Sequence, residues 1–230
     1  MGVRSSAARA LIPIGLKVAP QLTSSYVREV LERAIDGAGP IRGAAAAADA
    51  KLRAANGDVD AAVGDLIESH VRMAGVEGFV TNIGGLVTLA VSIPANITGL
   101  TLLQCHLVAG IASLRGYDLA DARVRNAVLA CLLGEDTVRG LLKNKRLPST
   151  PMALATSPVH DPELDRRIAS EVTTEMVAKI AGRHAVLVVG RRIPVLGGGV
   201  GALTDGYSTW QIGRYARAEF RDRRRPVPPG

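Results

Sequence analysis

Four histidines are the side chains best suited to acid–base or metal chemistry: His70, His106, His160 and His184. None stands in an HExxH pattern or at another spacing that would bring ligands to one ion, so we predict no metal site. His70 lies among apolar residues at helical spacing, where a hydrogen-bonded core histidine is the simpler interpretation. His106 interrupts an uncharged segment, where a neutral, hydrogen-bonded imidazole is expected because a charged one would be costly.

A nucleophile with its base is not evident in this chain. Cys105 directly precedes His106, and neighbours in a helix point to different sides, so these two side chains cannot act together. The GxSxG pattern of a serine hydrolase does not occur. A hydrolase-like or lipid-modifying enzyme would need Asp118, His106 and His160 to converge in space. We keep that as the least favoured alternative and predict no catalytic residues.

A glycine run from Gly197 to Ala202 contains the spacing GxGxxA. A dinucleotide site needs a preceding strand, a following helix and a further parallel strand. Ala185 to Val189 could form the first strand, but fewer than 30 residues follow the run, so the unit cannot close. We therefore expect no cofactor. Gly197 and Gly201 instead predict a face of small residues on which two helices pack closely.

No Asp, Glu, Lys or Arg occurs between Gly78 and Leu114, a segment of 37 residues in a chain that is 21% charged. Such a segment must be shielded from water, in a protein core or in a membrane. We expect two apolar helical pieces, Leu86 to Ile93 and Ala95 to Leu114, separated by a break at Pro94. The second piece carries several polar residues, which makes it a marginal membrane span.

The composition favours packed helices. Hydrophobic residues make up 47% of the 230 residues, aromatic residues only 3%, and glycines number 25. The core must therefore be built from small aliphatic side chains, which suits helices better than a β-sandwich. We predict an all-α, compact multi-helix bundle with a central apolar helical hairpin around Pro94 and a glycine-rich C-terminal helix pair. Residues 23–220 form the domain, between an irregular arm at 1–22 and a basic, proline-rich tail at 221–230.

Capping residues and glycines predict where the other helices begin and end. Six helices or segments are expected: a helix from Thr23 or Ser24 to Asp36, a helix from Ile41 to Ala55, a helix capped by Asp58, a helix from Asp118 to Gly134, a mobile connector from Lys143 to His160, and a helix that starts at Asp161-Pro162 and stops at Gly182. A last amphipathic helix is expected from about Leu203 to Phe220.

The net charge is +7, and positive charge gathers near the C-terminus. From residue 214 onward two acidic residues oppose six arginines: Arg214, Arg217, Arg221, Arg223, Arg224 and Arg225. A basic end beside a long apolar segment favours an anionic membrane surface or lipid as partner. Nucleic acid is not expected, because aromatic side chains for base stacking are scarce. A solvated basic tail is the plainer alternative.

Cys105 and Cys131 both lie in apolar sequence, and free, buried thiols in a reducing compartment are expected. The short apolar run near the N-terminus is closed by Lys17 and does not resemble a secretory signal. We therefore expect a cytoplasmic protein, peripheral at the inner membrane face.

Several short motifs follow one another between Ser92 and Ala202. In order they are SIPAN at Ser92–Asn96, LRGYDL at Leu114–Leu119, LLG at Leu132–Gly134, and RIPVLG at Arg192–Gly197 with Gly199, Gly201 and Ala202. In this order they resemble the EcsC family, whose pattern is roughly GGxxGLxxIPADL, a YGYDL-like turn and IPxxGxxxGA. The resemblance covers about Gly75 to Phe220. Two positions depart from it: Asn96 replaces a frequent acidic residue and Arg115 a frequent aromatic one.

The resemblance implies a helical, membrane-associated accessory protein, since some relatives are encoded beside an ATP-driven exporter. It carries over no catalytic residues. The motif positions to which it gives structural roles are Gly85, Pro94, Gly116, Tyr117, Asp118, Gly134 and Pro194.

Our leading hypothesis is therefore a non-catalytic protein that associates with lipid or with a membrane partner. The residues expected to make that contact are Leu86, Ile93, Pro94, Leu100, Gly197, Gly201, Arg191 and Arg192. The alternative is an interaction module that forms a homo-oligomer or docks on another protein through its apolar surface.

Overall fold

The computed structural model describes residues 23–38, 41–83, 89–189 and 197–223. Its elements, in chain order, are α2 (Ser24–Asp36), β1 (Gly37–Ala38), β2 (Ile41–Arg42), α3 (Ala44–Ala54), α4 (Val59–Ile83), α5 (Leu89–Leu114), α6 (Ala122–Leu132), α7 (Glu135–Lys143), α8 (Pro151–Ala155), α9 (Pro162–Val189) and α10 (Gly197–Glu219). The two strands form one short antiparallel ladder that pairs Gly37 with Arg42. The predicted all-α bundle is confirmed.

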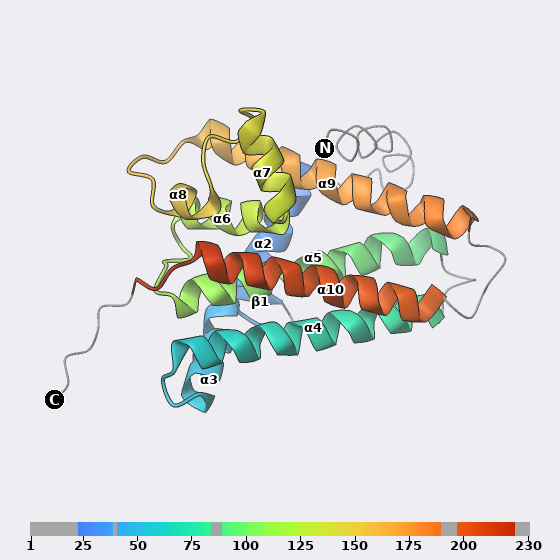
Figure 1. Cartoon of the computed structure of the whole chain (residues 1–230), viewed down its shortest axis with the longest axis horizontal. Coiled ribbons are helices and arrows are strands. Elements are labelled where there is room, and N and C mark those ends of the chain that lie inside the picture. Colours follow the sequence, from blue (N-terminus) through green and yellow to red (C-terminus); the bar gives the residue numbers. More distant parts are fainter. Residues whose placement is uncertain (1–22, 39–40, 84–88, 190–196, 224–230) are drawn as a thin grey trace.

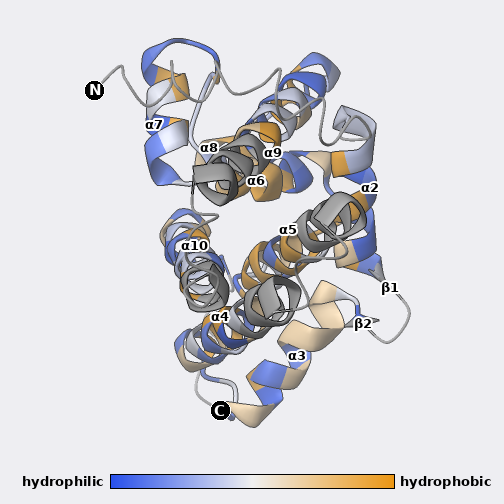
Figure 2. Ribbon diagram, turned by 90° about the vertical axis from the view of Figure 1, so that its right-hand side faces the viewer, coloured by the Kyte–Doolittle hydropathy of each residue, from blue (hydrophilic) through white to orange (hydrophobic). Residues whose placement is uncertain are grey.

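Four long helices run along the molecule: α4, α5, α9 and α10 (Figure 1). The pair α4 and α5 forms a hairpin, and α10 lies against both of them, packing most extensively on α4. Viewed along these helices, α3 covers one side of the hairpin while α6 and α8 lie beyond α5 and α10 (Figure 2). Helix α2 packs on α5 and α9.

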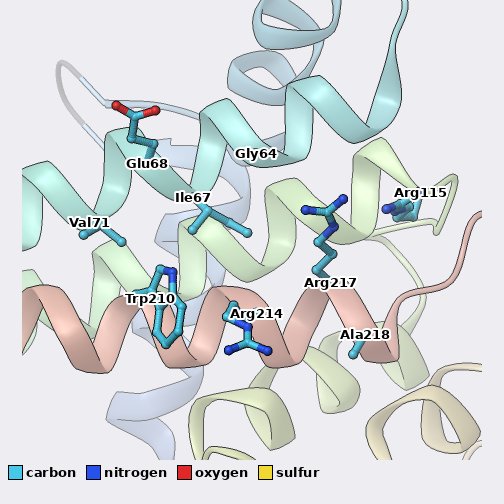
Figure 3. Close-up of a pocket in the computed structure, with 9 residues that line it drawn as sticks. All are labelled: Gly64, Ile67, Glu68, Val71, Arg115, Trp210, Arg214, Arg217 and Ala218. Carbon is cyan, nitrogen blue, oxygen red and sulfur yellow. The ribbon is translucent and has the colours of Figure 1, made fainter.

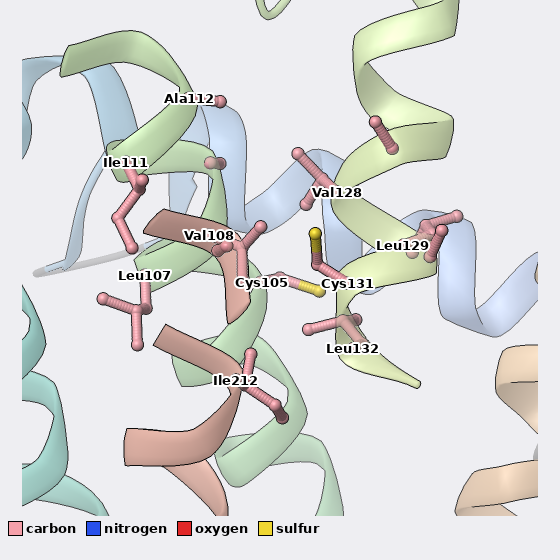
Figure 4. Close-up of a cluster of buried hydrophobic side chains, with 14 of the residues drawn as sticks. Cys105, Leu107, Val108, Ile111, Ala112, Val128, Leu129, Cys131, Leu132 and Ile212 are labelled. Atoms are coloured by element: carbon pink, nitrogen blue, oxygen red, sulfur yellow. The ribbon is translucent and has the colours of Figure 1, made fainter. Parts of the chain in front are cut away.

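The core is built from small aliphatic side chains, as the composition predicts. Leu107, Val108 and Ile111 of α5 meet Val128 of α6 and Ile212 of α10, and all are buried (Figure 4). Cys105 and Cys131 lie in the same cluster as free, buried thiols. Burial raises the pKa of Cys105 to about 12 and that of Cys131 well above its usual value, so both thiols stay neutral.

Local signals placed most helix starts correctly. The Thr23 hydroxyl accepts the Tyr26 N–H at the start of α2. The Asp58 carboxylate accepts the Ala61 N–H before α4, and that of Asp161 accepts the Glu163 N–H before α9. Each is an N-cap contact of the kind that satisfies otherwise unpaired backbone donors.

Two predicted helix breaks are wrong. Helix α5 runs without interruption through Pro94, its sixth residue, so the chain does not break there. A proline this close to a helix start removes a single intrahelical hydrogen bond, and the rest of the helix is unaffected. Helix α9 continues past Gly182 to Val189, so Ala185–Val189 is helical and not a strand. An isolated glycine weakens a long helix without ending it.

The region after α5 also differs from expectation. Asp121, not Asp118, caps α6 by accepting the Arg123 N–H at 2.9 Å, while Asp118 accepts the Ala120 N–H within the preceding turn. The connector Lys143–His160 contains α8, which is capped by Thr150, has Leu154 buried and packs against α6. Arg125, in the same region, pairs with Glu32 and donates to the Leu119 carbonyl.

Gly43 joins β2 to α3 at a close backbone contact. A Cβ added there would lie 2.5 Å from the Ile35 carbonyl oxygen and 3.0 Å from that of Asp36. These are backbone atoms at the end of α2, and they cannot swing away as a flexible side chain would.

We therefore expect Gly43→Ala to lower the free energy of unfolding by about 1–3 kcal/mol, measured by urea denaturation. The matched control is Gly140→Ala in α7, where an added Cβ meets nothing within 4 Å. That substitution should raise stability by about 0.5–1 kcal/mol through helix propensity. Equal stability changes in the two variants would contradict the close contact.

Candidate functional site

A groove of about 690 Å³ lies between α4 and α10 (Figure 3). Its floor is apolar and its C-terminal end is lined by guanidinium groups. The lining residues are Gly64, Ile67, Glu68 and Val71 of α4, Arg115 after α5, and Trp210, Arg214, Arg217 and Ala218 of α10.

One exposed face of α10 continues along this groove. Leu203, Tyr207, Trp210, Arg214 and Arg217 follow at intervals of four, three, four and three residues, which places them in one stripe. The first three side chains are 75%, 59% and 38% exposed, which is unusual for large apolar groups. We call these five residues the α10 stripe. It is apolar in its first half and basic in its second.

Contacts between neighbouring side chains of the stripe hold them in place relative to one another. The Tyr207 and Trp210 rings stack with their centroids 5.8 Å apart. The Arg214 guanidinium lies over the indole, 4.7 Å from its centroid. A cation held over an aromatic face is favoured electrostatically and needs no carboxylate partner. The charge of Arg214 thus remains available at the surface.

A shared carboxylate links the groove to the end of α5. Arg115 and Arg217 both donate from Nη2 to Oδ1 of Asp60, at 2.7 and 3.1 Å. The Arg115 side chain is only 10% exposed, and its buried Nε makes no hydrogen bond among the described residues. The hydrogen bond from Arg115 holds the pKa of Asp60 below its usual value. Two guanidinium groups on one carboxylate leave a surplus positive charge.

The turn after α5 fixes the backbone of Arg115. Gly116 has φ of 81°, and the N–H groups of Gly116 and Tyr117 donate to the carbonyls of Ser113 and Ala112. This is a Schellman cap, which requires the left-handed conformation that glycine adopts most easily. Tyr117 then packs edge-on against Phe220 at 5.0 Å between centroids. The GYD motif therefore anchors the end of α5 to the end of α10.

The C-terminal residues reinforce that anchor. The Arg223 N–H donates to the Arg115 carbonyl at 2.9 Å, and the Glu219 carboxylate accepts the Met152 N–H at the start of α8. Gly134, with φ of 80°, similarly makes the turn between α6 and α7. Gly116, Tyr117 and Gly134 thus hold helix ends in place, and Arg115 is the residue of the LRGYDL motif that lines the described groove.

Many of the contact and motif residues predicted from the sequence lie outside the described part of the structure. Five predicted positions fall outside the described residues: Gly85, Leu86, Arg191, Arg192 and Pro194. Ile93 and Pro94 belong to α5, and Gly197 and Gly201 to the start of α10, with only their backbone described. Leu100 is half-buried on α5. The described lining of the groove does not include Leu100.

The three groups that a hydrolase would require have separate partners. His160 is exposed and pairs with Asp165, while Asp118 belongs to the turn before α6. His106 is buried and bonds to His70 at 2.9 Å. The described residues contain no cluster of three or more metal-binding side chains. None of the described helices combines the length and apolar character needed to cross a membrane.

We expect Asp60→Asn to lower stability by about 1 kcal/mol, because Arg115 would lose its anionic partner. The figure is small because Asp60 is 63% exposed and screened by solvent. The folded-state pKa of Asp60 lies below its ordinary value of 3.8, so its contribution is present above that pH and lost as pH falls through the folded value. The free energies of unfolding of the wild type and the variant, measured in urea, should therefore converge in acid.

The control is Asp136→Asn, at a carboxylate that is 87% exposed. An equal effect of both substitutions at neutral pH would contradict the shared ion pair.

Comparison with known proteins identifies the family. The model of the EcsC protein family matches residues 28–224, which include all of the elements from α3 to α10. No curated protein and no solved structure matches the chain significantly. The match spans most of the sequence, including the groove, the α10 stripe and the GYD turn. The chain belongs to the EcsC protein family.

Proposed function

We propose that this protein binds anionic phospholipid surfaces peripherally, through the α10 stripe and the arginines of the groove. The observation that carries the proposal is the order of side chains along one exposed helix face. Exposed Leu203, Tyr207 and Trp210 run directly into Arg214 and Arg217.

Apolar, aromatic and basic groups in this order match the layers of a membrane surface. Leucine, tyrosine and tryptophan enter the boundary between headgroups and acyl chains, and arginines pair with phosphates. Each basic residue near an anionic surface contributes about 1 kcal/mol, and the attraction weakens as salt screens it. Four more arginines follow the stripe in the sequence, and they enlarge the positive electrostatic field: Arg221, Arg223, Arg224 and Arg225.

The groove suits the same partner. Its floor of Ile67 and Val71 is apolar, and its basic end is formed by Arg115, Arg214 and Arg217. Among the described residues Arg214 has the Trp210 ring, and no carboxylate, as its partner. Binding a phosphate there would therefore break no ion pair of Arg214. Glu68, at the opposite side of the groove, is the acidic group that opposes an anion.

We expect the purified chain to co-sediment with vesicles containing about 30% phosphatidylserine and not with pure phosphatidylcholine vesicles at low salt. Raising the salt concentration to about 0.5 M should release it, because the Debye length then falls well below 10 Å.

The double variant Arg214→Gln/Arg217→Gln should bind about 10- to 30-fold more weakly, since two contributions of about 1 kcal/mol are lost. Arg33→Gln/Arg139→Gln is the charge-matched control on α2 and α7, where both arginines are exposed. Equal weakening in test and control pairs would mean that net charge alone acts. Absence of wild-type binding at any salt concentration would overturn the proposal, and a concentration-dependent oligomer in sedimentation would then favour the interaction module.

A further inference from the structure

The pair His70 and His106 forms a buried bridge that the groove does not use. His70 Nε2 and His106 Nδ1 face each other at 2.9 Å. The outer nitrogen of each ring also has a partner: His70 Nδ1 lies 2.8 Å from the Leu66 carbonyl, and His106 Nε2 lies 2.9 Å from the Arg42 carbonyl. The bridge therefore links three elements: His70 on α4 contacts His106 on α5, and His106 contacts Arg42 in β2.

The two rings lie end to end and are not stacked face to face. Bonds of about 1.33 Å place each nitrogen of a five-membered ring about 1.1 Å from the ring centre. Two such radii added to the 2.9 Å nitrogen separation reproduce the 5.2 Å between the ring centroids. The planes differ by 23°, so the rings are nearly coplanar. Each inner nitrogen thus points its lone pair or its proton directly at the other.

Counting protons exposes a mismatch in this bridge. A carbonyl oxygen only accepts, so both outer nitrogens must carry a proton to bond with Leu66 and Arg42. A neutral imidazole has one proton, which leaves both inner nitrogens as acceptors. Two facing lone pairs at 2.9 Å repel each other. Three hydrogen bonds need three protons, and a neutral pair has two.

We propose that His70 and His106 form a one-proton switch, in which a single added proton between the inner nitrogens allows all three hydrogen bonds at once. Without that proton one of the three bonds must open. The Arg42 contact is the one that yields, because β2 is a two-residue strand, whereas Leu66 is a neighbour within α4. Protonation fastens β2 to the helical hairpin, and deprotonation releases it.

The surroundings set the range in which the switch works. Burial lowers the pKa of His106 and lowers that of His70 to about 4, and the charge of each ring disfavours a second proton on the pair. The ammonium of Lys51 on α3 also lowers the pKa of His70. Arg42 of β2 contacts the pair through its backbone carbonyl, and its side chain is exposed.

Burial disfavours the charged form of the pair, but the first added proton creates a hydrogen bond between the two rings, and this bond favours uptake of that proton. The pair should therefore take up one proton between about pH 6.5 and 4, the ordinary value and the lowered value of His70. The second proton should not bind before the protein unfolds in acid.

The direct test is imidazole NMR of the ¹⁵N-labelled full chain between pH 4 and 8. We expect His70 and His106 to titrate together with an uptake of one proton per pair, and His106 Nε2 to lose its proton above the midpoint. Two separate one-proton steps, or two rings that keep fixed neutral tautomers until acid unfolding, would overturn the proposal.

Linkage gives a second readout. In the unfolded chain both histidines are protonated below pH 6.5. Below the native midpoint the unfolded state therefore holds one more proton than the folded pair. We measure the unfolding equilibrium constants of the wild type and of His70→Gln/His106→Gln. Below the native midpoint, their ratio (wild type over variant) should rise tenfold for each unit by which the pH falls. A hundredfold rise would mean that the native pair takes up no proton, and no rise would mean that it takes up two. Either result contradicts the switch, and the NMR titration of the wild type decides the matter if the double variant does not fold.

Discussion

Close approach between α10 and the hairpin of α4 and α5 is the constraint on which the rest of the structure depends. At Gly213 a Cβ would lie 3.0 Å from Ile67 and 3.3 Å from Leu107, so three helices meet where a side chain is missing. Gly206, seven residues earlier, faces the Val71 carbonyl in the same way. Residues seven apart share one helix face. With that face fixed against the hairpin, the stripe from Leu203 to Arg217 must point outward.

Polar contacts fix the position of α10 along the hairpin. The Gln104 amide of α5 donates to the Thr209 hydroxyl at 3.2 Å in the buried interface. At the C-terminal end, the Tyr117 and Phe220 rings and the ion pairs of Asp60 tie the same helices together. Glycines alone would allow α10 to slide, whereas these contacts select one register. The arginines of the groove therefore occupy fixed positions relative to its apolar floor.

The sequence predicted the helical fold but did not indicate the groove, for different physical reasons. Caps such as Thr23 and Asp58 act within one turn, so local sequence was sufficient to place them. The break at Pro94 failed because tertiary packing maintains a helix that loses one hydrogen bond. The small-residue face was inferred at Gly197 and Gly201, whereas the described contacts of this kind are at Gly206 and Gly213.

The groove depends on residues distant in sequence, and no local pattern joins Asp60 to Arg115 and Arg217. One signal was available, since Arg115 departs from the aromatic residue common in the family. The spacing of Tyr207, Trp210 and Arg214 was a second signal, visible once α10 is drawn as a helix. The proton mismatch of His70 and His106 needed the coordinates, because it depends on which atom each nitrogen faces.

The scarcity of aromatic residues has a practical consequence at Trp210. It is the only tryptophan among the 230 residues, and it lies in the groove between Tyr207 and Arg214. Fluorescence that is excited at the red edge of the indole absorption band therefore originates at one place in the molecule. Whatever displaces the guanidinium, wets the groove or buries the ring will change the emission of that one fluorophore. The protein thus carries its own optical label at the surface where its function is proposed.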